Sequence, residues 1–127
     1  MKKIITSKNA PAPIGPYSHA VMVGNMLFVS GQVGKHPETG ELMLADIATE
    51  TNQVMKNIQG ILAEAGLTFV HVVKTTIFLT DLNSFAAVNE VYASYLTGAG
   101  FPARETVQVS KLPLGVNVEI SVIAIGE

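Results

Sequence analysis

The sequence contains no cysteine, and Arg104 is the one arginine among its eight cationic Lys and Arg residues. The lack of cysteine excludes disulfides, thiolate nucleophiles and cysteine-based metal sites. No apolar run approaches the length of a membrane span. Lys2 and Lys3 are followed by only two isoleucines before polar residues, so no signal peptide is predicted. We therefore expect a cytoplasmic protein.

Charged residues are also scarce, at 14% of 127 residues, whereas 48% of the residues are hydrophobic. Typical soluble domains carry about 25% charged residues. The length fits one domain, residues 1–127, with a substantial core. A small protein so short of charge is expected to cover part of its surface with copies of itself. The net charge of −2, with no basic block, argues against a nucleic-acid surface.

Hydrophobic periodicity predicts two helices that alternate with strands. Apolar residues recur at helical spacing over residues 47–65, with Asp46 as the N-cap and Gly66 at the C-terminal end. A second helix is predicted over Ser84–Leu96, and its buried stripe is Phe85, Val88, Tyr92 and Leu96. The predicted strands are Ile4–Thr6 at an edge, His19–Val23, Met26–Gly31, His71–Leu79 with both faces covered, and two strands within Phe101–Ile125.

The core order ββαβαββ predicts an α+β fold with both helices on one sheet face. The other face of the sheet would be bare in a monomer. Phe101–Ile125 alternates polar and apolar residues and is predicted to form a β-hairpin that turns near residues 112 and 113. Depending on the register, Glu119 lies diagonal to Arg104 or directly opposite it.

Two interpretations of Arg104 and Glu119 stay open at this point. In the first, the two side chains form a structural salt bridge. In the second, the guanidinium binds a substrate carboxylate and Glu119 accepts protons or binds water. Taken alone, Tyr17 is equally consistent with a packing ring, and Asn89 with a solvated helix residue.

Other kinds of site lack support in the sequence. His19, His36 and His71 do not have metal-ligand spacing. Neither a phosphate-binding glycine loop nor a nucleophile elbow is present. The remaining groups are Arg104, Glu119 and the hydroxyls of Tyr17, Ser30 and Thr106. These groups suit a small carboxylate-bearing substrate and a hydrolysis without metal or covalent intermediate.

Several motifs, in order along almost the whole chain, resemble the RidA/YjgF family of reactive-intermediate deaminases. They are Gly15-Pro16-Tyr17-Ser18, Ser30-Gly31-Gln32, Asn89-Glu90-Val91-Tyr92, Pro102-Ala103-Arg104 and Val118-Glu119-Ile120. The resemblance implies a chorismate-mutase-like fold and a homotrimer with three sites between subunits. It also implies hydrolysis of 2-imino acids, derived from 2-aminoacrylate or 2-aminocrotonate, to 2-oxo acids and ammonia. No metal or cofactor is expected.

Site residues follow from the resemblance position by position. Arg104 corresponds to the arginine that binds the substrate carboxylate, and Glu119 to the carboxylate that activates water. Tyr17, Ser30, Gly31 and Asn89 correspond to residues that line the pocket. Many relatives have cysteine where Thr106 stands, so Thr106 is expected to contribute its backbone N–H and a small side chain.

Glu105 replaces a residue that is usually small in the family, and His19 one that is usually glutamine. Because Glu105 alternates with Arg104, we expect it to face away from the pocket.

Two other functions are alternatives to the deaminase. A non-catalytic small-carboxylate-binding or protein-protecting module would keep the pocket without turnover. An endoribonuclease or translation inhibitor is opposed by the acidic balance and the single arginine.

Overall fold

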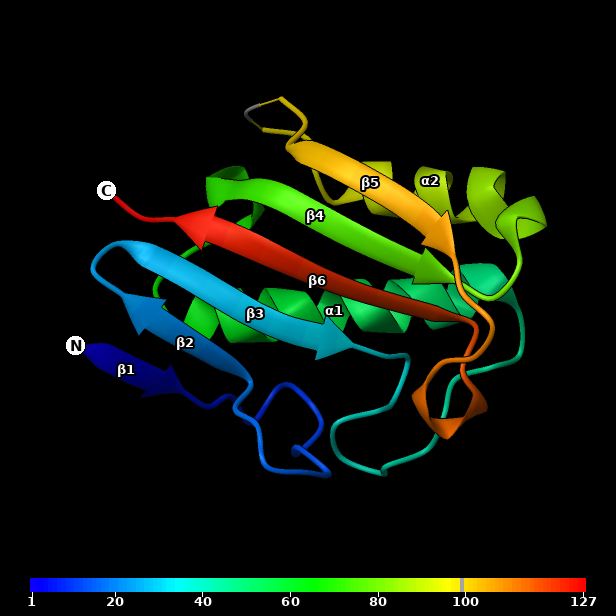
Figure 1. Cartoon of the computed structure of the whole chain (residues 1–127), viewed down its shortest axis with the longest axis horizontal. Coiled ribbons are helices and arrows are strands. Elements are labelled where there is room, and N and C mark those ends of the chain that lie inside the picture. The colour runs from blue at the N-terminus through cyan, green and yellow to red at the C-terminus, as the bar shows by residue number, and fades with distance from the viewer. Residues whose placement is uncertain (99) are drawn as a thin grey trace.

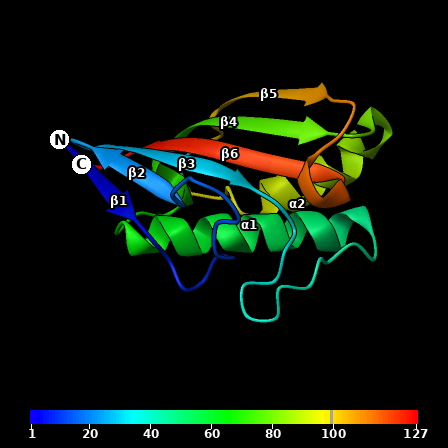
Figure 2. The ribbon, with the colours of Figure 1, turned by 60° about the horizontal axis from the view of Figure 1, so that its bottom comes forward.

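The computed structural model describes residues 1–98 and 100–127, which form a six-stranded sheet with two α-helices on one face (Figure 1). Figure 2 shows both helices on the same side of the sheet, as predicted. The strands are β1 (Lys2–Ile5), β2 (Ala20–Val23), β3 (Met26–Gln32), β4 (Val72–Leu79), β5 (Ala103–Gln108) and β6 (Val118–Ile125). The helices are α1 (Ile47–Glu64) and α2 (Phe85–Ser94), with 3₁₀ turns at Phe69–His71, Leu82–Ser84 and Pro113–Gly115.

The strand order is β1-β2-β3-β6-β4-β5, so the last strand of the sequence lies in the middle of the sheet. β4 and β5 run parallel, and β6 is antiparallel to both β3 and β4. The predicted β-hairpin over Phe101–Ile125 is therefore wrong, because β4 separates its two strands. Alternation fixes which face a side chain takes but not which strand lies alongside. The strongly apolar β6 takes the centre, and the polar β5 takes the edge.

One face of the sheet carries the core and the other is open. In β4, Thr75 and Ile77 are buried. Val73 of the same strand is 43% exposed. The expectation that this strand is covered on both faces is thus wrong for the single chain. The open face also exposes Val23, Phe28 and Val107. A bare apolar sheet face, as predicted, is present.

The first helix follows its sequence signals closely. Asp46 caps α1 by accepting a hydrogen bond from the Thr49 N–H at 2.7 Å, which lowers the pKa of Asp46. Gly66 ends the helical segment with a φ of +76°, a conformation that glycine adopts without strain. Side chains with no exposed surface join this helix to the sheet: Val54, Ile58, Ile61, Leu62, Leu27, Ile77, Leu79, Val118, Ile120 and Ala124.

The second helix is shorter than predicted, since a 3₁₀ turn occupies Leu82–Ser84 and α2 ends at Ser94. Val88, Tyr92 and Leu96 of the predicted stripe are buried. Phe85 is 40% exposed. Within residues 1–98 and 100–127, no helix has both the length and the apolar character needed to cross a membrane.

Candidate functional site

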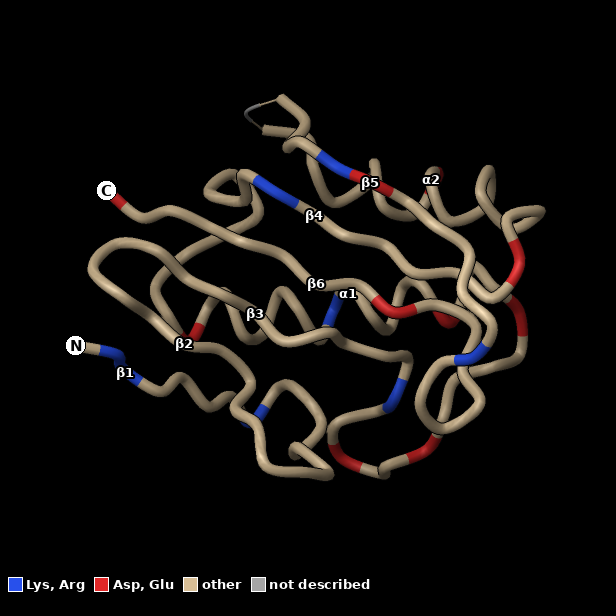
Figure 3. Tube along the Cα trace, in the orientation of Figure 1, with Lys and Arg blue, Asp and Glu red and all other residues tan. Residues whose placement is uncertain are grey.

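Five of the seven predicted site residues line two separate pockets, whereas Ser30 and Thr106 line neither of them. Tyr17, Gly31 and Glu119 line the first, called here the glutamate pocket, at the end of β3 and the start of β6. Asn89 and Arg104 line the second, called the arginine pocket, between α2 and β5. Figure 3 shows charged residues on β5 and on β6, two strands that β4 separates in the sheet.

Glu119 lies directly over Gly31 in the glutamate pocket. A Cβ atom added to Gly31 would lie only 2.4 Å from Oε2 of Glu119, so a side chain at position 31 would displace the carboxylate. Glycine is therefore required here for the approach of Glu119. Burial raises the pKa of Glu119 above its ordinary value. A carboxyl group with a raised pKa is better suited to exchange protons near neutral pH.

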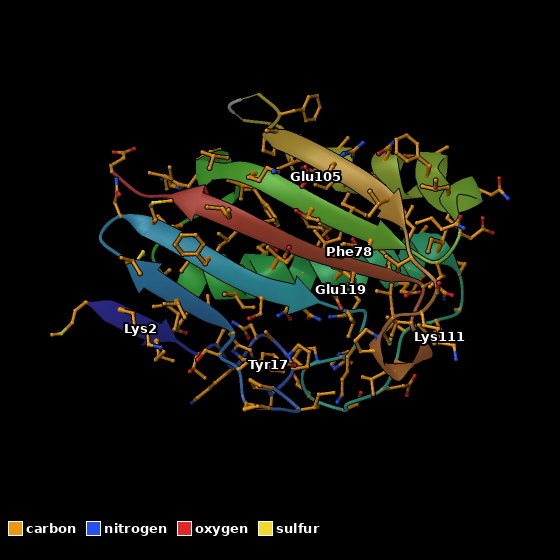
Figure 4. The ribbon with its side chains drawn as sticks, viewed as in Figure 1. Lys2, Tyr17, Phe78, Glu105, Lys111 and Glu119 are labelled. Carbon is orange, nitrogen blue, oxygen red and sulfur yellow. The ribbon has the colours of Figure 1, made fainter. Side chains whose placement is uncertain are left out.

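Tyr17 reaches the same pocket from the loop before β2, and its side chain is 48% exposed. Its hydroxyl oxygen accepts a hydrogen bond from the Ile14 N–H at 3.4 Å. Figure 4 shows Tyr17 and Glu119 in one view of the open face. The packing-ring interpretation does not fit a ring this exposed.

Ser30 and His19 hold the loop that carries Tyr17. The Ser30 hydroxyl donates to the Ser18 carbonyl at 2.6 Å. The buried His19 ring accepts from the Ser7 N–H at 3.0 Å and lies 2.7 Å from the Pro11 carbonyl, to which Nε2 donates. His19 is therefore a structural anchor. Among the described residues, no group of three His, Cys, Asp or Glu side chains is placed to bind a metal.

In the arginine pocket, three side chains of α2 fix the guanidinium of Arg104. Its Nη1 donates to Oδ1 of Asn89 at 2.7 Å. Its central carbon lies 5.5 Å from the Phe85 ring centroid and 5.2 Å from that of Tyr92. Phe85, Asn89 and Tyr92 are spaced by four and three residues and so share one side of the helix. Asn89 is thus a partner of Arg104 and not a solvated residue.

Thr106 follows Arg104 on the same face of β5. Its hydroxyl is buried and has no hydrogen-bond partner within the part of the chain that the structure describes. Glu105, between them, faces away from the arginine pocket, as its alternation with Arg104 predicts, but it lies on the open face that also carries Glu119. Its Oε2 accepts from the Thr76 hydroxyl at 2.9 Å and lies 3.2 Å from Nζ of Lys74. The Thr76 hydrogen bond and then Lys74 lower the pKa of Glu105.

The two principal site residues lie on opposite faces of the sheet. Arg104 pairs with Thr75, which is buried beneath α2, and Glu119 pairs with Phe78 on the open face. Figure 4 shows Glu119, Phe78 and Glu105 on the face turned away from the helices. The prediction that Arg104 and Glu119 lie side by side is therefore wrong within one chain. A structural salt bridge between them in the monomer is excluded as well.

The sequence interpretation missed two polar residues behind the glutamate pocket. Glu50 and Asn57 have no exposed surface, yet both lie in α1 among its buried positions. From the sequence alone, Glu50 is also consistent with an acid in the first turn of the helix that interacts favourably with the helix dipole. The signal that could have identified both residues is their position on the core-facing side of the predicted helix, where a polar side chain needs a buried partner.

Several known proteins are similar to this chain in fold and sequence. The family model described as Endoribonuclease L-PSP matches residues 7–126. The Escherichia coli protein named 2-iminobutanoate/2-iminopropanoate deaminase is 46% identical, over 98% of both chains. The rat protein of the same name is 46% identical over 98% of this chain and 90% of its own. The crystal structure of E. coli TdcF with bound serine superposes with a TM-score of 0.95 at 42% identity, covering 98% of this chain and 99% of that one.

The fold and site define an α+β protein that carries the arginine pocket and the glutamate pocket on opposite faces of one sheet. Its similarity to proteins of known family extends over nearly the whole sequence. The chain belongs to the RidA/YjgF family, and the resemblance of its motifs to that family is confirmed.

Proposed function

We propose that the protein hydrolyses small 2-imino acids, formed from 2-aminoacrylate or 2-aminocrotonate, to 2-oxo acids and ammonia. One observation carries the proposal: Asn89 holds Arg104 at a pocket, and the other guanidinium N–H groups, which have no hydrogen-bond partner among the described residues, can bind a carboxylate. The names of the relatives give the reaction. Glu119 supplies the second group that such a hydrolysis needs.

The active site is formed between two subunits. A single sheet separates Arg104 from Glu119, so a substrate that touches both groups needs the arginine pocket of one chain and the glutamate pocket of another. The open apolar face supports this association. We assign a homotrimer with three such clefts, in which Tyr17, Gly31 and Glu119 face Asn89, Arg104 and Thr106 of the neighbouring subunit.

The reaction then uses groups of the chain itself. Arg104 binds the substrate carboxylate through two parallel N–H···O bonds and so fixes C2 of the protonated imine. Glu119 accepts a proton from a water molecule while the water oxygen bonds to C2. The proton passes from Glu119 to the nitrogen of the resulting carbinolamine. The C–N bond then breaks as the hydroxyl gives its proton back to Glu119, so that ammonia leaves and the 2-oxo acid forms; Glu119 finally releases this proton to solvent.

A coupled assay tests the activity. A serine or threonine dehydratase generates the enamine, and the rate of pyruvate or 2-oxobutyrate formation is compared with and without the protein. We expect the protein to accelerate release of ammonia. An unchanged rate at excess protein would leave the non-catalytic carboxylate-binding module as the better assignment.

Mixing two inactive variants tests the shared site. Arg104→Ala and Glu119→Gln chains, co-refolded in equal amounts, combine at random. About a quarter of the clefts should then hold both native groups, because these come from different chains. Activity near a quarter of wild type is expected. No recovery after verified subunit exchange would show that one chain supplies both groups.

The family-model description raises a ribonuclease as the second candidate. The net charge of −2 opposes it, since phosphate backbones are bound mainly by Lys and Arg. Incubation of the protein with labelled single-stranded RNA should leave the RNA intact at protein concentrations that saturate the deaminase assay.

A further inference from the structure

Helix α1 carries a stripe of buried polar side chains that the proposed chemistry does not use. Glu50 and Asn57 have no exposed surface, and Gln53 between them is 9% exposed. The three are spaced by three and four residues and so lie on one side of the helix. Buried polar groups are costly unless they are hydrogen-bonded, and a buried charge is costlier still. Their partners therefore reveal what this stripe holds in place.

Glu50 binds the start of β6. Its Oε2 accepts from the N–H groups of Asn117 at 2.7 Å and Val118 at 3.1 Å, and its Oε1 accepts from Nδ2 of Asn117 at 2.8 Å. None of the described cations forms an ion pair with Glu50. Two backbone donors and one amide thus solvate a buried carboxylate in place of a counter-ion.

These contacts occur where the sheet gives β6 little support on one side. β3 pairs with β6 no further than Gln32 and Ile120, and its register is irregular just before that point. On the N-terminal side of Ile120, where β3 no longer pairs with β6, Glu50 accepts hydrogen bonds from the N–H groups of the two residues that immediately precede Glu119. Gly34 packs against the same side chain, since a Cβ there would lie 2.8 Å from Cγ of Glu50.

Asn57 holds the opposite wall of the glutamate pocket. Its Nδ2 donates to the carbonyls of Val33 at 3.1 Å and Lys35 at 2.9 Å, and its Oδ1 accepts from Gln53 at 2.9 Å. Val33 and Lys35 both line that pocket. One helix therefore binds both the segment that leads into Glu119 and a second segment that lines the same pocket.

We propose that Glu50 is a positioning residue for Glu119, acting through the backbone of Asn117 and Val118, and that Asn57 positions the facing wall. Neither side chain touches the substrate. The proposal rests on the imine hydrolysis assigned above. It predicts that loss of Glu50 impairs the water-activating half of the site and leaves the carboxylate-binding half intact.

Steady-state kinetics of three variants test this role. In Glu50→Ala, kcat should fall about tenfold or more because Glu119 is displaced, while KM stays within about twofold because Arg104 is untouched. Glu50→Gln keeps an oxygen that can accept both backbone N–H groups, so its kcat should stay within about threefold of wild type. Thr51→Val is the matched control: Thr51 is the next residue, is equally buried and makes no hydrogen bond with a described residue. It should retain wild-type kinetics.

A second measurement is independent of turnover. The carboxyl ¹³C resonance of Glu119 is titrated in wild type, Glu50→Ala and Thr51→Val. The titration midpoint should move only in Glu50→Ala. If wild-type protein lacks imine hydrolysis, the proposed function fails while this titration still decides the positioning role.

Three outcomes would overturn the proposal. They are wild-type kcat in folded Glu50→Ala, an unshifted Glu119 titration in that variant, and equal losses in Glu50→Gln and Glu50→Ala, which would indicate a role for the charge itself. If Glu50→Ala does not fold, Asn117→Ala removes one of the three donors. A kcat about threefold below wild type is then expected, and unchanged kinetics would refute the role.

Discussion

Arg104 owes its orientation to its immediate neighbours on α2. The rings of Phe85 and Tyr92 stack against the guanidinium, and Asn89 holds one of its nitrogens. The contacts with aromatic faces suit any cation, whereas a two-bond grip on a carboxylate requires the planar guanidinium. Stability and substrate binding therefore depend on different properties of this one side chain.

We expect Arg104→Lys to separate these properties. The unfolding free energy should change by no more than about 1 kcal/mol because a cation over the rings is kept. The value of kcat/KM should fall about 100-fold because the ammonium cannot bind a carboxylate bidentately. Thermal melts and the coupled assay measure the two effects. A large melting shift with preserved activity would contradict the substrate-binding role.

Glu119 has a pKa raised by burial, so its effects depend on pH. The rate should fall as pH drops through this raised pKa, at a higher pH than the ordinary glutamate value of 4.5. In Glu119→Gln, turnover should drop about 100-fold while a 2-oxo acid still binds.

The same shift has a consequence for stability. The folded state binds the Glu119 proton more tightly than the unfolded chain does, so stability decreases as pH rises from the unfolded to the folded pKa. Glu119→Gln should therefore melt higher than wild type near neutral pH and alike below the ordinary value. A variant that is less stable at neutral pH would show that Glu119 has a structural partner.

The chemical roles of Arg104 and Glu119 could be predicted from the sequence, but the residues that contact them could not. A single arginine in a strand and a glutamate two residues into another strand stood out by type and spacing. The partner of Arg104 turned out to be Asn89, and the carboxylate with the most hydrogen bonds was Glu50. Side-chain contacts between distant segments depend on the strand order, which local patterns do not encode.

At the scale of elements, the helices were predictable because their caps and stripes are local signals. The position of β6 was not, since the hairpin is the simplest link between two successive strands. The apolar character of residues 118–125 beside the polar character of 103–108 was the available clue. A strand with one face fully buried favours the middle of a sheet over its edge.

The junction of α2 with β4 provides an element-level prediction. The Tyr92 hydroxyl donates to the buried Thr75 hydroxyl at 2.8 Å. Tyr92→Phe should cost about 1–2 kcal/mol of unfolding free energy because Thr75 loses its partner. Its kcat/KM should stay within about twofold, since the ring still stacks on Arg104. Tyr95→Phe, a partly buried tyrosine outside both pockets, is the control, and a similar kinetic loss in both variants would contradict this division.

At the scale of the whole molecule, the low charge content and the open face point to self-association. Light scattering should give about three times the chain mass of 13.4 kDa. Phe28→Asp, on the exposed face, should dissociate the assembly and abolish turnover together, because burying an unpaired charge is unfavourable. A trimer that tolerates this change would show that another surface joins the subunits.

The central place of β6 also affects how the chain acquires its structure during synthesis. Until residues 118–125 leave the ribosome, β1–β3 and β4–β5 have no strand to join them, although both helices are already complete. The nascent chain then presents two unpaired inner edges, β3 and β4, to other chains. A message truncated before Val118 should therefore yield aggregates and not a smaller soluble domain.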